Sequence, residues 1–126
     1  MHRSRIGVVL LDFPGDTHDD AQRFWSGAVG HDAEPEDNDP DYALLGPLGT
    51  LKLFTQRTGQ GTPARVHLDI ETDNVAAEVA RLTALGATIG TEMKHYTVMR
   101  DPSGMVFCVV PVQTGDAFAP NATEWP

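Results

Sequence analysis

The clearest pattern in the chain is the strict alternation of polar and apolar residues from Arg65 to Glu71. Because successive side chains of a strand point to opposite faces, the pattern predicts a strand over 65–72 with His67 and Asp69 on one face. The apolar residues of the run, which we expect helices to cover, are Val66, Leu68 and Ile70. Whether the face with His67 lines a cavity or faces water decides whether its side chains can form a site with a chemical function.

An amphipathic helix is predicted to follow this strand, over 74–85. Its apolar stripe consists of Val75, Val79 and Leu82, at the spacing of one helical face. Asp73 is the predicted N-cap, and Gly86 marks the end of the helix. Further strands are predicted at 87–93, 96–100 and 105–111, with a hairpin turn through Asp101-Pro102-Ser103-Gly104 before the last one.

The first half of the chain shows the same order of elements. The apolar run from Ile6 to Leu11 is typical of a strand buried on both faces. A helix is predicted to begin near Thr17, whose hydroxyl can cap it, and to end at Gly30. The side chains expected to form its buried face are Ala21, Phe24, Trp25 and Ala28. An acidic stretch over 32–41, interpreted as a mobile loop that closes over a cup, then precedes strands at 42–45 and 50–56.

The two halves form a repeat, since Arg5-Ile6 and Arg65-Val66 stand 60 positions apart. Each half is a βαβββ unit, over 5–58 and 64–112, and the glycine-rich segment 59–63 is the predicted hinge. Strands, helices and hairpins in this order predict an α+β fold with a mixed sheet. A half of this size is marginal alone, so we expect both to pack as one domain spanning 1–126. Residues 113–126 lack periodicity and are interpreted as an ordered or fraying surface arm.

The amino-acid composition of the chain limits the classes of molecule that it is expected to bind. The 126 residues include 18 acidic and 9 basic ones, a net charge of -9, which argues against binding to nucleic acid or to an anionic membrane. The single cysteine, Cys108, excludes an intramolecular disulfide and fits a reducing compartment. No apolar run approaches the length of a membrane span, and the N-terminus does not read as a secretory signal. We therefore expect a cytoplasmic protein.

The chain resembles the vicinal oxygen chelate superfamily, which includes glyoxalase I, bleomycin resistance proteins and extradiol dioxygenases. The resemblance rests on the two βαβββ halves, on Phe24-Trp25, on Val66-His67-Leu68-Asp69, and on the hairpin from Arg100 to Val110. It covers about 1–112 and is closest to the short glyoxalase-like domain proteins. It implies that the sheets curl into a cup and that the protein is a homodimer. The same cup serves isomerases, dioxygenases and binding proteins, so membership alone does not define an activity.

The resemblance also implies four metal ligands, one from the first and one from the last strand of each half. Only His67 matches, whereas the other positions hold Cys108, Lys52, and Gly7 or Val8. A His–Cys pair falls short of the three protein ligands typical of catalytic zinc. We therefore expect no metal cofactor.

The predicted cup is lined by residues whose strand parity points inward. They are Lys52, Phe54, His67, Asp69, Tyr96, Arg100 and Cys108, with Arg65, Val98, Val106 and Val110 beside them. A partly apolar pocket with a few convergent polar groups is the usual signature of a small-molecule site. Each polar member also has a structural interpretation: His67 as an inherited hydrogen-bonded histidine, Cys108 as a small buried hydrophobe, and Lys52 as an ion-pair partner of Asp69 or a solvent-exposed cation.

Two classes of function remain open at this stage. The first is a metal-free protein that binds a small organic ligand, as resistance proteins sequester cationic antibiotics of the bleomycin type. The second is an enzyme: a lyase or isomerase with His67 as base and Lys52 or Arg100 stabilising an enolate, or a degenerate metalloenzyme completed by water or a partner subunit. An interaction module without a ligand is the third alternative.

Overall fold

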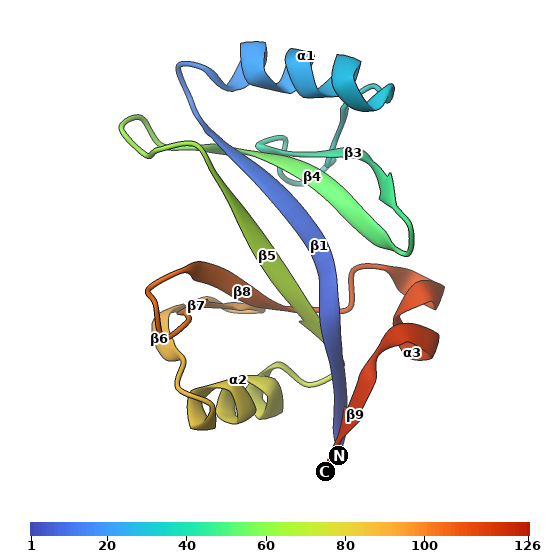
Figure 1. The fold of residues 1–126 in the computed structure, drawn as a ribbon, viewed down its shortest axis with the longest axis vertical. Helices are drawn as coiled ribbons and strands as arrows, with labels where there is room; N and C mark the ends of the chain where they lie inside the picture. Colours follow the sequence, from blue (N-terminus) through green and yellow to red (C-terminus); the bar gives the residue numbers. More distant parts are fainter. The chain divides into compact units, whose positions relative to one another are not determined.

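The computed structural model describes residues 1–126, with nine strands, three α-helices and one short 3₁₀ helix (Figure 1). The order βαβββ occurs twice and is followed by a C-terminal arm, as the sequence pattern predicts. The first set is β1 (His2–Pro14), α1 (His18–Val29), β2 (Glu34–Pro35), β3 (Tyr42–Leu48) and β4 (Leu51–Thr58). The second set is β5 (Arg65–Thr72), α2 (Val75–Ala84), β6 (Thr88–Glu92), β7 (Thr97–Arg100) and β8 (Val106–Pro111). The arm holds η1 (Gly115–Ala117), α3 (Phe118–Asn121) and β9 (Thr123–Trp125).

The chain forms two compact units. Unit 1 consists of Met1–Val8 together with His67–Pro126, and unit 2 consists of Val9–Val66. The long strand β1 contributes its first residues to unit 1 and the remainder to unit 2. None of the helices combines the length and the apolar character that crossing a membrane would need.

In unit 1, the strands β5, β8, β7 and β6 lie side by side in that order. β5 and β8 run parallel, whereas β8–β7 and β7–β6 are antiparallel pairs. The β5–β8 pair is parallel because α2 and the β6–β7 hairpin carry the chain back between them, as a parallel connection requires. β9 pairs with the beginning of β1, where Trp125 lies opposite His2, so both ends of the chain lie together (Figure 1).

Helix α2 covers one face of this sheet. The buried cluster contains Ala87, Met99, Phe107 and Val109, and Ile70 with the predicted helix stripe of Val75, Val79 and Leu82 packs against it. The stripe is therefore confirmed. The cap is not the predicted one, because the Asn74 side chain accepts the Ala77 N–H at 3.0 Å. Asp73 instead accepts the Arg3 backbone N–H at 2.8 Å, which binds it to β1.

Helix α1 of unit 2 presents a different face from the predicted one. Phe24 and Trp25 are 66% and 38% exposed and form a T-shaped pair with ring centroids 5.4 Å apart. The inner face instead carries buried His18, and Gln22, whose amide donates to Thr55 Oγ1 at 2.8 Å. The prediction of a buried aromatic face was wrong because the hydrogen bond from Gln22 to β4 turns another side of the helix toward that strand. Thr17 makes no side-chain cap bond, but Gly30 ends the helix with φ 73° as expected.

Strand β1 is longer than predicted and is not buried on both faces. Ile6 is exposed, and from position 8 on burial follows the period of two that one covered face produces: Val8, Leu10 and Asp12 are buried, whereas Val9 and Leu11 are half-buried. The acidic stretch that follows α1 is anchored rather than free along its length. Glu34 and Pro35 pair with β3, and the Glu36 N–H donates to the Tyr42 carbonyl at 2.8 Å. Closure of this segment over a cup stays a prediction.

Candidate functional site

Three potential ligand side chains meet on the face of the unit 1 sheet that α2 leaves uncovered. His67 and Asp69 stand two residues apart on β5, and Asp69 is the register partner of Cys108 on β8. Ile70 and Val109, the next register pair, point to the opposite face and join the α2 core. We call the side of the sheet with His67, Asp69 and Cys108 the donor face.

The donor atoms of His67, Asp69 and Cys108 all lie within 4.8 Å of one another. His67 Nε2 is 3.4 Å from Asp69 Oδ1. His67 is buried at 5% exposure, while Asp69 and Cys108 are partly accessible. An imidazole, a carboxylate and a thiol make up a donor set that fits zinc, whose catalytic sites use three protein ligands and one open position. In this half of the chain the ligand positions that the resemblance implies are those of His67 and Cys108, and they do not include Asp69.

Strand β7 adds further predicted residues to the donor face. Val98 is the register partner of Cys108, and Arg100 is the partner of Val106. Thr97 pairs with core residue Val109 on the opposite face, and Tyr96 immediately precedes the strand. The parity that the sequence left uncertain is thus the inward one for Arg100, whereas the position of Tyr96 stays a prediction because it precedes the strand.

Arg100 lies at the outer edge of the donor face. Its Nη1 donates to the Gly104 carbonyl at 3.0 Å, which ties the guanidinium to the hairpin turn. That turn is organised by Asp101, whose Oδ1 accepts from Ser103 N and Met105 N, both at 2.8 Å. The hydrogen bonds from Ser103 and Met105 lower the pKa of Asp101, so the carboxylate that holds the turn is ionised at neutral pH.

Lys52 and Phe54 belong to β4 of unit 2. Phe54 is buried, Lys52 is half-buried, and neighbouring Thr55 receives the hydrogen bond from Gln22 of α1. Strand alternation therefore turns Lys52 and Phe54 away from α1, as their predicted parity requires. That they share a cup with His67, and that Lys52 pairs with Asp69, stay predictions.

Glu71 continues the series of inward-facing residues on β5, but its carboxylate has a structural role. It is fully buried and accepts hydrogen bonds from Arg5 Nε at 2.7 Å, Thr114 Oγ1 at 2.7 Å, Gln113 N at 2.8 Å and Thr114 N at 3.0 Å. Burial alone would raise the pKa of Glu71, but the hydrogen bonds from Thr114, Arg5 and Gln113 outweigh it and lower the pKa. Glu71 is thus an ionised anchor between β1, β5 and the arm.

The same carboxylate explains why Gly7, one of the two residues at the implied first-strand ligand position, has no side chain. A Cβ placed on Gly7 would collide with the side chain of Glu71. Position 7 must therefore remain glycine while Glu71 keeps this place, and it can offer no ligand atom.

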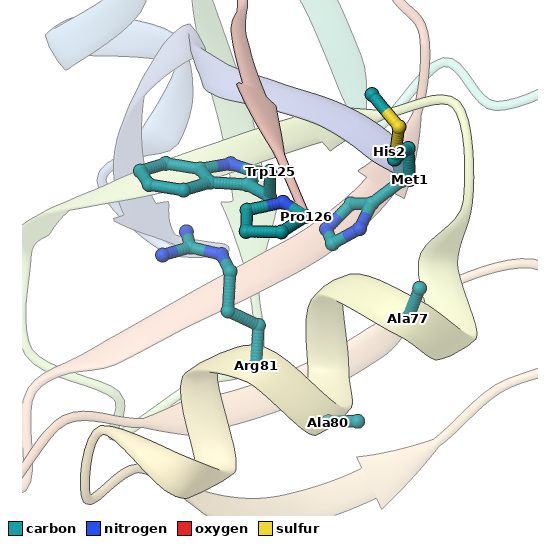
Figure 2. Close-up of a pocket in the computed structure, with 7 residues that line it drawn as sticks. All are labelled: Met1, His2, Ala77, Ala80, Arg81, Trp125 and Pro126. Atoms are coloured by element: carbon teal, nitrogen blue, oxygen red, sulfur yellow. The ribbon is translucent and has the colours of Figure 1, made fainter.

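A separate hollow of about 590 Å³ lies between α2 and the two ends of the chain. Figure 2 shows the residues around it: Met1, His2, Ala77, Ala80, Arg81, Trp125 and Pro126. None of the site residues predicted from the sequence lines this hollow. The Arg81 guanidinium lies 3.7 Å from the centroid of the Trp125 ring (Figure 2). The polar groups around the hollow are thus engaged with one another rather than turned toward a ligand.

Buried Glu78 holds this region together. Its carboxylate binds His2 Nε2 at 2.8 Å and Arg81 through two bonds of 2.8 and 2.9 Å. Burial by itself would raise the pKa of Glu78, but the hydrogen bonds from Arg81, Ser4 and His2 lower it from 4.5 to about 2. Ser4 also accepts the Trp125 indole N–H at 2.8 Å, so one carboxylate links α2, β1 and the arm. The hydrophobic periodicity of the sequence does not predict these contacts.

Comparisons with known proteins place the chain in one family. The family model described as "Glyoxalase-like domain" matches residues 9–110. No curated protein is significantly similar in sequence to the chain.

Solved structures share the fold at low sequence identity. A Streptomyces coelicolor methylmalonyl-CoA epimerase is 15% identical, with a TM-score of 0.56 over 85% of this chain and 93% of its own. A glyoxalase/bleomycin resistance protein/dioxygenase superfamily member from Vibrio splendidus is 11% identical, with a TM-score of 0.53 over 89% and 100%. A hypothetical protein from Bacillus halodurans reaches 0.63 at 10% identity over 87% and 95%. These likenesses confirm the α+β vicinal oxygen chelate fold.

Proposed function

Because this chain belongs to the family of glyoxalase-like domains, we propose that it binds a small organic molecule on the donor face of unit 1. The observation that carries the proposal is the convergence of His67, Asp69 and Cys108 within 4.8 Å, on the side of the sheet opposite α2. Three polar groups on one sheet face, with apolar side chains beside them, match the composition of small-molecule sites.

The chemistry of the face supports a ligand with both polar and apolar parts. His67 and Asp69 can hydrogen-bond a polar group of the ligand, and the half-buried side chains Val98 and Val106 offer it an apolar surface. Asp69, in a chain of net charge -9, favours a cationic group near the site, in keeping with sequestration of a cationic compound. The protein is proposed to act in this way as a cytoplasmic homodimer.

A thermal-shift screen of the metal-free, reduced full chain tests this function. A ligand at 100 times its Kd should add about 2.7 kcal/mol to the free energy of unfolding. His67→Ala should remove the shift, whereas His95→Ala, at an exposed loop histidine of the same unit, should keep it. A compound that stabilises both variants as much as the unchanged chain would bind elsewhere and contradict the proposal.

The 3.4 Å approach of His67 Nε2 to Asp69 Oδ1 favours a second candidate, a lyase or isomerase with His67 as general base. A carboxylate beside an imidazole orients the ring and stabilises its protonated form. The base would take a proton from the carbon next to a carbonyl, and Arg100 would stabilise the resulting enolate. Exchange of the α-proton of a 2-oxo acid in D₂O, followed by NMR, should then depend on His67. Exchange no faster than in buffer, or equal exchange with His67→Ala, would eliminate this candidate.

A further inference from the structure

Arg100 is the one arginine of the chain that has no acidic partner. The other six arginines each form an ion pair with a carboxylate: Arg3 with Glu124, Arg5 with Glu71, Arg23 with Asp20, Arg57 with Asp19 and Asp41, Arg65 with Asp12, and Arg81 with Glu78. Asp101, which follows Arg100 in the sequence, accepts hydrogen bonds from the hairpin turn instead. Because the chain has 18 acidic and 9 basic residues, a shortage of carboxylates does not explain this unpaired guanidinium.

The guanidinium of Arg100 is held by the turn but keeps donors for a ligand. Its Nη1 donates to the Gly104 carbonyl at 3.0 Å, and no protein group accepts a hydrogen bond from Nε or Nη2. The group is planar, and its N–H donors form a rigid fork, so the bond to Gly104 limits the directions of the remaining donors. Two parallel N–H groups match the two oxygens of a carboxylate. Arg100 is also exposed, so a ligand can reach these donors.

A carboxylate stands on the same face of the sheet, two strands away from Arg100. Arg100 pairs with Val106 of β8, and Cys108, on the same face of β8, pairs with Asp69 of β5. From the spacing of strands and of residues along a strand, the Cα atoms of Arg100 and Asp69 lie roughly 12 Å apart. The half-buried side chains of Val106 and Cys108 lie between them, with Val98 beside Cys108. An apolar strip thus separates a cation from a carboxylate.

We propose that Arg100 is the anion-binding residue of the donor face, and that the ligand is a zwitterion with its carboxylate on Arg100 and an ammonium group toward Asp69. The inference rests on the proposed function and names the chemical class of its ligand. A ligand with a cationic group alone would leave Arg100 without a counter-charge. A hydrocarbon segment between the two charged groups of the ligand would lie over Val106.

NMR titration of the reduced, metal-free full chain with the ω-amino carboxylates from aminobutanoate to aminooctanoate tests this class. Alkylamines and alkyl carboxylates of the same lengths carry one charge each and are the matched probes. At least one zwitterion should shift the amide signals of Val98, Arg100 and Val106. It should bind at least about 10-fold more tightly than the alkylamine of equal length, the gain expected from hydrogen bonds between charged groups.

The inference and the proposed function can fail separately in this titration. An alkylamine that binds as tightly as the zwitterion overturns the inference but keeps a small-molecule site on the donor face. Failure of every ω-amino carboxylate to bind at millimolar concentration also overturns the inference, whereas the ligand screen with His67→Ala decides the proposed function.

Substitutions at Arg100 test its role directly. Arg100→Gln should weaken zwitterion binding at least about 10-fold and leave alkylamine binding unchanged. Arg100→Lys keeps the charge without the planar fork and should restore only part of the affinity. Lys94→Gln removes an exposed cation of the same unit and should bind the zwitterion as the unchanged chain does. Equal affinity of Arg100→Gln and Lys94→Gln would refute the role of Arg100. Circular dichroism of each variant separates lost binding from lost folding.

Discussion

The carboxylate of Glu71 occupies the space that a side chain on Gly7 would need. Glu71 is fully buried on β5, and Gly7 lies on the part of β1 that belongs to unit 1. The absence of a Cβ at position 7 therefore allows a buried ionised acid to join β1, β5 and the beginning of the arm. The pair also shows why Gly7, one of the two residues at the implied first-strand ligand position, carries no side chain.

Gly7→Ala should destabilise unit 1 by about 1–3 kcal/mol, because the new methyl group forces Glu71 or the strand to move. Urea unfolding followed by circular dichroism measures the change. Gly27→Ala is the matched control, since nothing lies within 4 Å of a Cβ there. Alanine is the better helix former, so this control should gain about 0.5–1 kcal/mol. Equal stability of Gly7→Ala and the unchanged chain would show that Glu71 does not need this space.

Glu71→Gln should lower the free energy of unfolding by about 3 kcal/mol, because it removes the negative charge from the 2.7 Å ion pair with the largely buried Arg5. The amide can no longer accept hydrogen bonds at both of its terminal atoms, so at least one bond from Gln113 or Thr114 is lost as well. Glu92→Gln, on the exposed edge strand β6, should change stability by less than about 0.5 kcal/mol. Similar unfolding midpoints for the two variants would argue against the anchoring role of Glu71.

Acid should weaken the contribution of Glu78 to the free energy of unfolding within a defined pH range. Its pKa falls from 4.5 to about 2 in the folded chain, so the folded state binds fewer protons than the unfolded state between these values. The stabilisation is fully present above about pH 4.5 and is lost as the pH falls toward 2, with a size of roughly 3 kcal/mol. Urea unfolding at several pH values should therefore show the gap between the unchanged chain and Glu78→Gln narrowing in acid. A gap independent of pH would contradict the lowered pKa.

Trp125→Ala should destabilise unit 1 by about 2–4 kcal/mol, because it removes the stacking on Arg81 and the hydrogen bond to Ser4. Amide hydrogen exchange at His2–Ser4, which pair with β9, should become faster. Trp25→Ala on the outer face of α1 serves as the matched control and should cost less than about 1 kcal/mol. Unchanged exchange at His2–Ser4 would mean that the arm does not protect β1.

Phe24→Ala should change stability by less than about 0.5 kcal/mol, because its ring is mostly exposed. Phe107→Ala should cost about 3–5 kcal/mol, since Phe107 belongs to the core beneath α2. Thermal unfolding of both variants distinguishes the observed face of α1 from the one that the hydrophobic pattern predicts. A large loss of stability for Phe24→Ala would instead support the buried aromatic face that the hydrophobic pattern predicts.

Local patterns were sufficient to predict most elements. Strand β5 has the predicted bounds, 65–72, and α2 begins within one residue of its predicted start. These elements depend on side-chain periodicity, which neighbouring residues determine. Thr17 stands at the N-cap position of α1, as predicted, but its side chain makes no cap bond. The predicted cap at Asp73 was wrong because a cap depends on one hydrogen bond, and Asn74 makes that bond in α2. The face of α1 was wrong because the contact between Gln22 and Thr55 joins residues far apart in the chain.

The sequence by itself determined the βαβββ repeat, the α+β class and the family, and it placed His67 and Asp69 on one face. Only the tertiary structure decided that Cys108 stands beside Asp69, because the register of two parallel strands is set by packing between segments that the sequence separates. That register turns a single matched ligand into three donors within 4.8 Å. The tertiary structure also buries Glu71 between β1, β5 and the arm, where its hydrogen bonds, rather than the sequence pattern, assign the carboxylate a structural role.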